Sequence, residues 1–223
     1  MAWIRKPFKY AYYNITLWLI CINVSIYVLM FICKKVTGID LTAYLGLSLQ
    51  CVIGQHFWWQ PLSYMFIHGG FLHVFLNMLA LFFFGFPTEK TIGSKEFLLL
   101  YLLCGILVGM GSLGVSYIML NATGNIMHCF VPMVGASGAV YAVLLTYAVC
   151  YPKSRIFIWG IIPVPAPLLI LIYFVVEFVA QIRGNTSVAH YAHLLGFLFA
   201  WLYLLIRMGI SPIKVWKNAY KRH

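Results

Sequence analysis

Long apolar runs constrain the fold of this chain more than any other feature. A helix needs about 20 consecutive apolar residues to cross the hydrocarbon core of a bilayer. Runs of that kind predict six membrane helices, at 15–33, 61–84, 97–120, 135–151, 165–182 and 190–208. Only 9% of the 223 residues are charged, whereas soluble domains carry about 25%. The expected fold class is therefore all-α, a polytopic bundle of six transmembrane helices.

The ends of these runs also carry predictions. Residues 1–14 lead into the first run without a small-residue cleavage site, which indicates a membrane helix rather than a cleaved signal. The segment 151–164 is expected to be a loop because it is rich in proline, and the fifth helix is expected to start at or just before Pro167. The whole chain, 1–223, is expected to form a single domain in the lipid bilayer, ending in a basic cytoplasmic tail at 209–223.

The distribution of Lys and Arg predicts the orientation. With the N-terminus in the cytoplasm, twelve basic residues fall on the cytoplasmic side and three, Lys34, Lys35 and Arg183, on the outer side. Both termini are then cytoplasmic. The net charge of +11 is scattered over short segments, so no nucleic-acid partner is expected. Among the six cysteines, a bond between Cys51 and Cys129 is left open.

Polar side chains gather at one predicted depth. The second, fourth and sixth helices all run from the outside to the inside. His68, His73 and Asn77 are early in the second, Ser137 opens the fourth, and His193 opens the sixth. Ionisable groups inside a membrane helix are costly and are by default functional candidates. These side chains are expected to meet in the outer part of the bilayer.

Each of these residues also has a simpler interpretation. Ser137 lies among small residues that commonly pack membrane helices. Gly196 and Ala200 give the sixth helix a small face that could pack against the fourth. His190, near the interface, is expected to be a wet surface residue. Glu177 is the one acid inside a predicted span, and its role is left open between a water-filled cavity and a side chain that reaches outward to water.

A serine and a histidine brought together have a definite chemistry. The hydroxyl of Ser137 is a weak nucleophile until a base such as His193 removes its proton, and the base can later return the proton to the leaving amine. No acid lies beside His193 in the sequence, so a dyad is expected. The oxyanion needs preorganised donors, and the Ser137 N–H at a helix N-terminus could supply one, with the side chains of His73 and Asn77 supplying others.

Taken together, the motifs resemble the rhomboid family of intramembrane serine proteases. The resemblance runs from about Trp58 to Ala200. It rests on the segments Tyr64-Met65-Phe66-Ile67-His68, His73-Val74-Phe75-Leu76-Asn77, Glu89-Lys90 with Gly93-Ser94, Gly135-Ala136-Ser137-Gly138 with Tyr141, and Ala192-His193 with Gly196. It implies a core at about 58–208 with six helices.

The resemblance also implies roles and partners. Ser137 is the nucleophile and His193 the general base, while His73 and Asn77 line the oxyanion site. Tyr141 supports the imidazole, Gly135 and Gly138 belong to the serine motif, and His68 is a structural residue at the head of the second helix. The implied substrates are single-span transmembrane proteins, cut near the outer face without a cofactor or metal. The expected location is a bacterial cytoplasmic membrane, with organellar and secretory membranes left open.

Two alternatives remain at this point. His68, His73, His190 and His193 could bind a metal or haem, since histidine is the commonest metal ligand, although the chain has no His-Glu-x-x-His motif. A rhomboid-like protein could also bind membrane helices without cleaving them.

Overall fold

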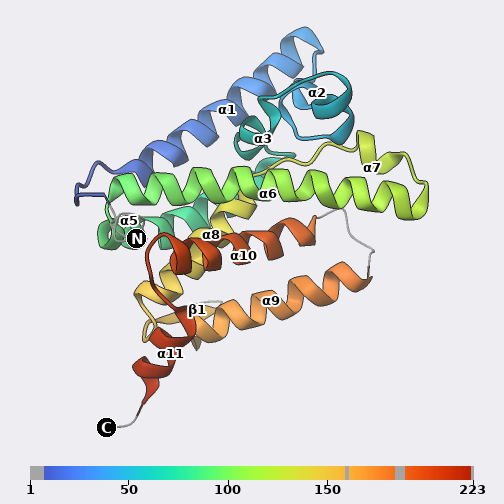
Figure 1. Ribbon diagram of the computed structural model, residues 1–223. Helices are drawn as coiled ribbons and strands as arrows, with labels where there is room; N and C mark the ends of the chain where they lie inside the picture. The colour runs from blue at the N-terminus through green and yellow to red at the C-terminus, as the bar shows by residue number, and fades with distance from the viewer. Residues whose placement is uncertain (1–7, 159–160, 184–188, 222–223) are drawn as a thin grey trace.

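The computed structural model describes residues 8–158, 161–183 and 189–221, which form a helical bundle (Figure 1). Within these described residues, four helical segments are long and apolar enough to cross a membrane: α1 (Ile15–Thr37), the continuous run Phe71–Ile92, α6 (Ser94–Thr123) and α9 (Ala166–Arg183). Two shorter apolar helices, α8 (Ser137–Cys150) and α10 (His190–Ile206), lie among them. The predicted class, a polytopic helical membrane bundle, is confirmed.

The second span differs from its prediction of 61–84. The first part of the predicted span, before Gly69-Gly70, forms two short helical turns instead, α3 (Gln60–Ser63) and η2 (Tyr64–Phe66). The span itself joins α4 (Phe71–Ala80), the π-helical turn η3 (Leu81–Gly85) and α5 (Phe86–Ile92). The sequence prediction ended too early because Thr88 and Glu89 are polar, yet both are fully buried in the structure.

Glu89 is buried because it satisfies the start of another helix. Its carboxylate accepts hydrogen bonds from the backbone N–H groups of Ile15 and Thr16, at 2.7 and 2.8 Å, and from the hydroxyl of Ser94. The first N–H groups of a helix have no acceptor within it and carry a partial positive charge. This contact ties α1 to the junction of α5 and α6.

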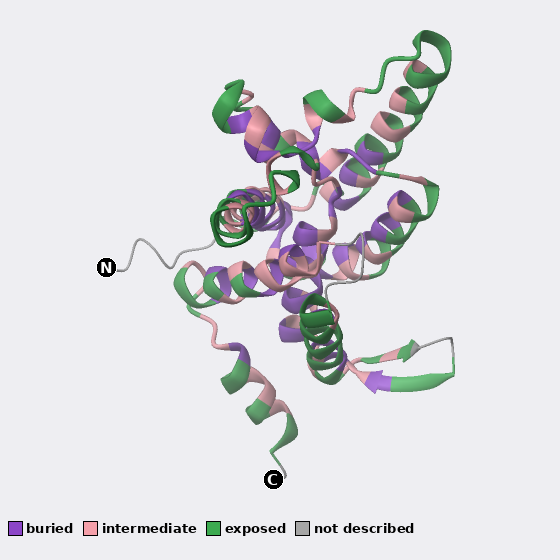
Figure 2. Cartoon of the chain, turned by 90° about the vertical axis from the view of Figure 1, so that its right-hand side faces the viewer, coloured by how far each residue is buried: buried purple, intermediate pink, exposed green. Residues whose placement is uncertain are grey.

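The helix α8 forms the centre of the bundle. Ten of its fourteen residues are buried, and Figure 2 shows buried residues gathered in the interior with exposed residues on the outer helices. The exposed side chains of α1 and α9 are mostly large and apolar, as a lipid-facing surface requires.

Glycines let α8 and α10 approach closely, as the small face of the sixth helix predicts. A Cβ atom on Gly196 of α10 would lie 2.4 Å from the carbonyl oxygen of Gly138 on α8. On its other side, Gly138 faces α6, where a Cβ atom would lie 2.7 Å from Val108 Cγ1. The two glycines therefore set the distance between the helices that carry Ser137 and His193.

We expect Gly196→Ala to destabilise the bundle, because the added methyl group forces α10 away from a rigid backbone atom. Overpacking of this kind typically costs about 1–3 kcal/mol. Gly114→Ala on α6 is the matched control, since its Cβ would meet nothing within 4 Å. Thermal unfolding in detergent measures both variants. Equal midpoints for the two variants would show that the close approach has no energetic role.

The segment between α1 and α4 is held by hydrogen bonds rather than by long elements. It contains α2 (Thr42–Leu45), the π-helical turn η1 (Gln50–Gly54) and α3. The buried amide of Gln60 accepts from the N–H of Ser48 and donates to the carbonyl of Ala43, both at 3.1 Å. A lone bridge joins Leu47 to Met133, just after α7 (Met127–Phe130). Cys51 and Cys129 are both free thiols, so the bond left open from the sequence is not formed.

One segment predicted as a loop has regular structure. Residues expected to form a loop pair instead as an antiparallel hairpin of β1 (Arg155–Ile158) and β2 (Ile162–Pro165). Directly after it, α9 starts at Ala166, as the position of Pro167 predicts. The expected tail contains a further helix, α11 (Pro212–Tyr220). It is fixed to the bundle by the indole N–H of Trp216, which donates to the Ala148 carbonyl at 2.9 Å.

Candidate active site

Ser137 and His193 meet at one end of the bundle. Ser137 is the first residue of α8, and His193 lies in the first turn of α10. The Nε2 atom of His193 is 2.9 Å from the Oγ atom of Ser137. Because the two residues begin their helices at the same end, the close α8–α10 packing brings hydroxyl and imidazole within hydrogen-bond distance.

The residues before Ser137 make room for a second histidine. Gly135 has a φ of +121°, which favours glycine, and a Cβ atom there would lie 2.7 Å from the ring of His73. The N–H of Gly135 donates to the carbonyl of Tyr64 at 3.0 Å. The N–H of Ala136 points to Nε2 of His68 at 3.5 Å. His68 is buried and lies edge-on to His73, with ring centres 5.1 Å apart.

Asn77 lies one turn after His73 on α4, and it is buried. One N–H of its amide donates to the His73 carbonyl at 2.9 Å, within the same helix. An amide nitrogen carries two N–H donors. The structure therefore brings His73 against Gly135, two residues before Ser137, and places Asn77 one turn further along α4.

Tyr141 covers one face of the His193 ring. The two rings are stacked, with centres 4.3 Å apart and planes 9° from parallel. The tyrosine also packs against Phe197, whose ring is tilted to it, at 5.0 Å between ring centres. This stacking restricts the rotation of the imidazole.

The structure adds a residue that the sequence did not place at the site. Glu177 on α9 is buried, and its carboxylate lies between the two histidines of α10. Oε1 is 3.0 Å from Nδ1 of His193, an ion-pair distance outside the geometry of an aligned hydrogen bond. Oε2 is 2.5 Å from Nδ1 of His190. Oε1 also accepts the hydroxyl proton of Tyr141 at 2.5 Å.

These contacts correct two expectations. An acid does lie beside His193, although none is near it in the sequence. His190 is not a wet surface residue, since its ring is paired with Glu177 and mostly covered. The sequence did contain one indication of this arrangement, namely Glu177 itself. A carboxylate inside a membrane span is tolerated only when it is paired or hydrated, so a partner for it was to be expected. Its partner could not be identified without the helix arrangement.

The same cluster bears on the metal hypothesis. Ligand atoms of Glu177, His190 and His193 lie within 4.8 Å of one another. The hypothesis from sequence grouped four histidines, but within the described residues His68 and His73 are not part of this set. Both carboxylate oxygens of Glu177 already have partners, His190 and Tyr141, whereas Nδ1 of His193 lies 3.0 Å from Oε1 without an aligned hydrogen bond.

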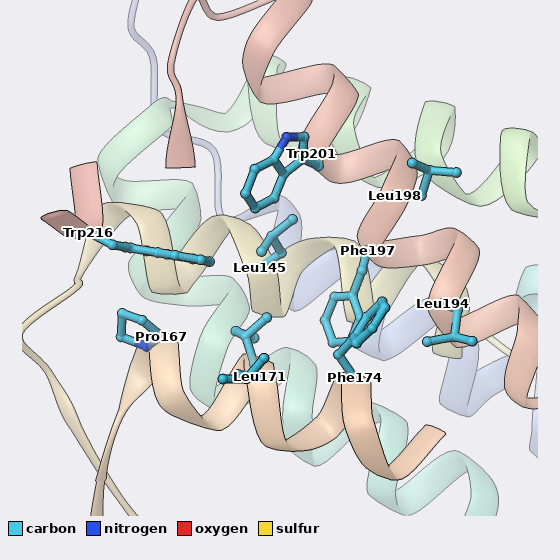
Figure 3. Close-up of a pocket in the computed structure, with 10 residues that line it drawn as sticks. Leu145, Pro167, Leu171, Phe174, Leu194, Phe197, Leu198, Trp201 and Trp216 are labelled. Carbon is cyan, nitrogen blue, oxygen red and sulfur yellow. The ribbon is translucent and has the colours of Figure 1, made fainter. Parts of the chain in front are cut away.

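An apolar cavity of about 380 Å³ lies behind the site, between α8, α9, α10 and α11. Figure 3 shows Phe174 of α9 and Phe197 of α10 facing each other within it, with Trp216 of α11 at one end. Phe197 also packs against Tyr141, so one wall of the cavity supports the ring that covers His193.

Comparison with known proteins places the chain in a family. The model of the Rhomboid domain matches residues 55–209. RHOMBOID-like protein 12, mitochondrial, of Arabidopsis thaliana is 32% identical over 138 residues, 59% of this chain and 41% of that protein. Rhomboid protease GluP of Bacillus subtilis (strain 168) is 32% identical over 48% of this chain and 22% of its own length. Presenilin-associated rhomboid-like protein A, mitochondrial, of Danio rerio is 29% identical over 69% of this chain and 37% of its own length.

The matches thus span less than half the length of these curated relatives. The family model, however, covers well over half of this chain. On that match, the chain is an integral, multi-pass membrane protein that belongs to the rhomboid family.

Proposed function

We propose that the protein is an intramembrane serine endopeptidase in which Ser137 is the nucleophile and His193 the general base. The observation that carries the proposal is the distance of 2.9 Å between Nε2 of His193 and Oγ of Ser137. Two further observations support it: the ring stacked on His193, and the glycines that bring the two helices together.

The reaction follows from this pair. Nε2 of His193 takes the hydroxyl proton as Oγ of Ser137 attacks the scissile carbonyl, which gives a tetrahedral intermediate. The imidazolium then returns the proton to the leaving amine, and an acyl-serine remains. A water molecule, deprotonated by the same nitrogen, releases the new carboxylate and restores the serine.

The oxyanion requires donors that are in place before the reaction. The backbone N–H of Ser137 opens α8, where the first N–H groups have no acceptor within the helix. His73, held against Gly135, is a second candidate donor. Asn77 can contribute the amide N–H that it does not use within its own helix.

The substrate class is proposed to be single-span transmembrane proteins, cut near the outer membrane face. A protease must bind an extended backbone, and a helix that contains Gly or Pro unwinds at lower cost. The proposed location is a bacterial cytoplasmic membrane with both termini in the cytoplasm. The mitochondrial names among the relatives make an organellar membrane the competing location.

The orientation can be tested with cysteine labelling. We expect Thr42→Cys to react with a membrane-impermeant maleimide from outside intact cells, and Lys153→Cys to react only after the membrane is opened. The reason is the twelve-to-three distribution of basic residues. The unmodified chain supplies the background from its own cysteines. Labelling of Lys153→Cys from outside would reverse the topology and place the site on the cytoplasmic side.

Proteolysis can be tested with the purified protein in liposomes and a model single-span substrate. We expect cleavage near the outer end of the substrate helix, unchanged by EDTA, because a serine–histidine pair needs no metal. Substrate binding without cleavage would favour a helix-binding protein. Cleavage that EDTA stops and zinc restores would show that the histidines act as ligands.

A further inference from the structure

We propose that Glu177 completes a Ser137–His193–Glu177 triad as a positioning residue for the histidine. The inference rests on the proposed protease function and adds a third member to its machinery. It starts from an arrangement that the sequence gives no reason to expect. Three side chains from three different helices are in contact, and the imidazole of His193 lies between the other two.

The two nitrogens of the His193 ring have different partners. Nε2 is 2.9 Å from Oγ of Ser137, and Nδ1 is 3.0 Å from Oε1 of Glu177. A carboxylate beside Nδ1 favours the tautomer that carries its proton there. That tautomer leaves the lone pair of Nε2 facing the serine hydroxyl, as a general base requires. Glu177 thus holds the ring in the state that can accept the proton.

The carboxylate is itself held in place. It accepts the hydroxyl proton of Tyr141 and contacts the ring of His190, and it is only 6% exposed. A buried acid in a membrane helix is costly unless its partners satisfy it. Tyr141 takes part twice, because its ring stacks on His193 and its hydroxyl binds Glu177. The orientation of the imidazole is therefore restricted by Tyr141 on one face and by Glu177 at the Nδ1 edge.

A second buried acid shows what a purely structural role looks like. Glu96 on α6 is almost fully buried, and its carboxylate accepts from the hydroxyl of Tyr203 and from the guanidinium of Arg207, with Nε at 3.1 Å. This cluster joins the start of α6 to the end of α10, whereas His193 lies at the start of α10, where it meets Ser137 at the start of α8. Glu96 and Glu177 are thus a matched pair of buried carboxylates, and only Glu177 contacts the imidazole.

The position of Glu177 gives the proposal a kinetic signature. The carboxylate contacts the Nδ1 edge of His193, whereas Ser137 is on the Nε2 edge. A residue that only positions the general base affects the rate of the chemical step and not the binding of a probe. Its replacement must therefore lower the maximal labelling rate and leave the half-saturating probe concentration unchanged.

The test measures the rate of fluorophosphonate labelling against probe concentration in the full-length protein, together with its thermal midpoint. Glu177→Gln keeps the shape and removes the charge. We expect its maximal rate to fall by about 10- to 10³-fold, less than the ~10⁴-fold seen when a soluble triad loses its acid, because Tyr141 still stacks on the ring. The half-saturating probe concentration should not change. Glu96→Gln should lower the midpoint and leave the maximal rate in place.

The conservative variant keeps the proposal testable if Glu177→Gln does not fold. Glu177→Asp retains the charge but draws the carboxylate back, so we expect a maximal rate between those of the wild type and Glu177→Gln. A Glu177→Gln protein that labels at the wild-type rate would overturn the proposal. So would a Glu177→Asp protein at the wild-type rate, if the glutamine variant is unfolded. A wild-type protein that is not labelled at all would instead overturn the protease function.

Discussion

We expect the replacement of Ser137 by alanine to abolish detectable cleavage of a model transmembrane substrate and to leave the fold intact. The change removes one oxygen atom from a face of small residues, so little packing is lost. Loss of the serine costs about 10⁶-fold in kcat in a soluble serine protease, and we expect at least about a 10³-fold loss here. Product formation in liposomes and the thermal midpoint in detergent measure the two effects.

A matched serine controls for the loss of a buried hydroxyl. Ser112 on α6 is 2% exposed, and its hydroxyl has no hydrogen-bond partner among the described residues. We expect Ser112→Ala to cleave substrate at the wild-type rate, since it removes the same atom away from the proposed site. Full activity in Ser137→Ala would contradict the serine-protease proposal.

His193→Ala should be as damaging as Ser137→Ala. The two residues act as a unit, so the double variant should be no slower than either single variant. His73→Ala and Asn77→Ala should have smaller effects, because loss of one oxyanion donor typically costs about 10²–10³-fold in kcat and the Ser137 N–H remains. His128→Ala on the short helix α7 is the control and should be fully active. Additive losses in the double variant would show that the residues act separately.

The general fold could be predicted because membrane helices depend on local composition. Apolar runs located the helices, and Pro167 located the start of α9. The prediction failed where polar residues are satisfied inside the protein. Glu89 ended the predicted second span too early, although its carboxylate is buried against the start of α1. The helix α11 within the expected tail is a related case, because Trp216 fixes it through a contact with a distant carbonyl group.

The candidate site was partly predictable. Ser137 and His193 could be proposed together because each begins an apolar run of the same orientation, and a shared depth follows from topology. Glu177 could not be assigned a partner in this way. Its neighbours are determined by how α9 packs against α8 and α10, and no periodicity in one helix contains that information.

The most direct test of the central claim is the position at which a fluorophosphonate attaches to the purified protein, determined by peptide mass spectrometry. The probe forms a covalent bond only with an activated hydroxyl group. The arrangement of Ser137 and His193 predicts a single adduct on Ser137, and no adduct in His193→Ala. An adduct on another residue, or one on Ser137 that forms equally fast without His193, would contradict the proposal that this pair is the catalytic centre.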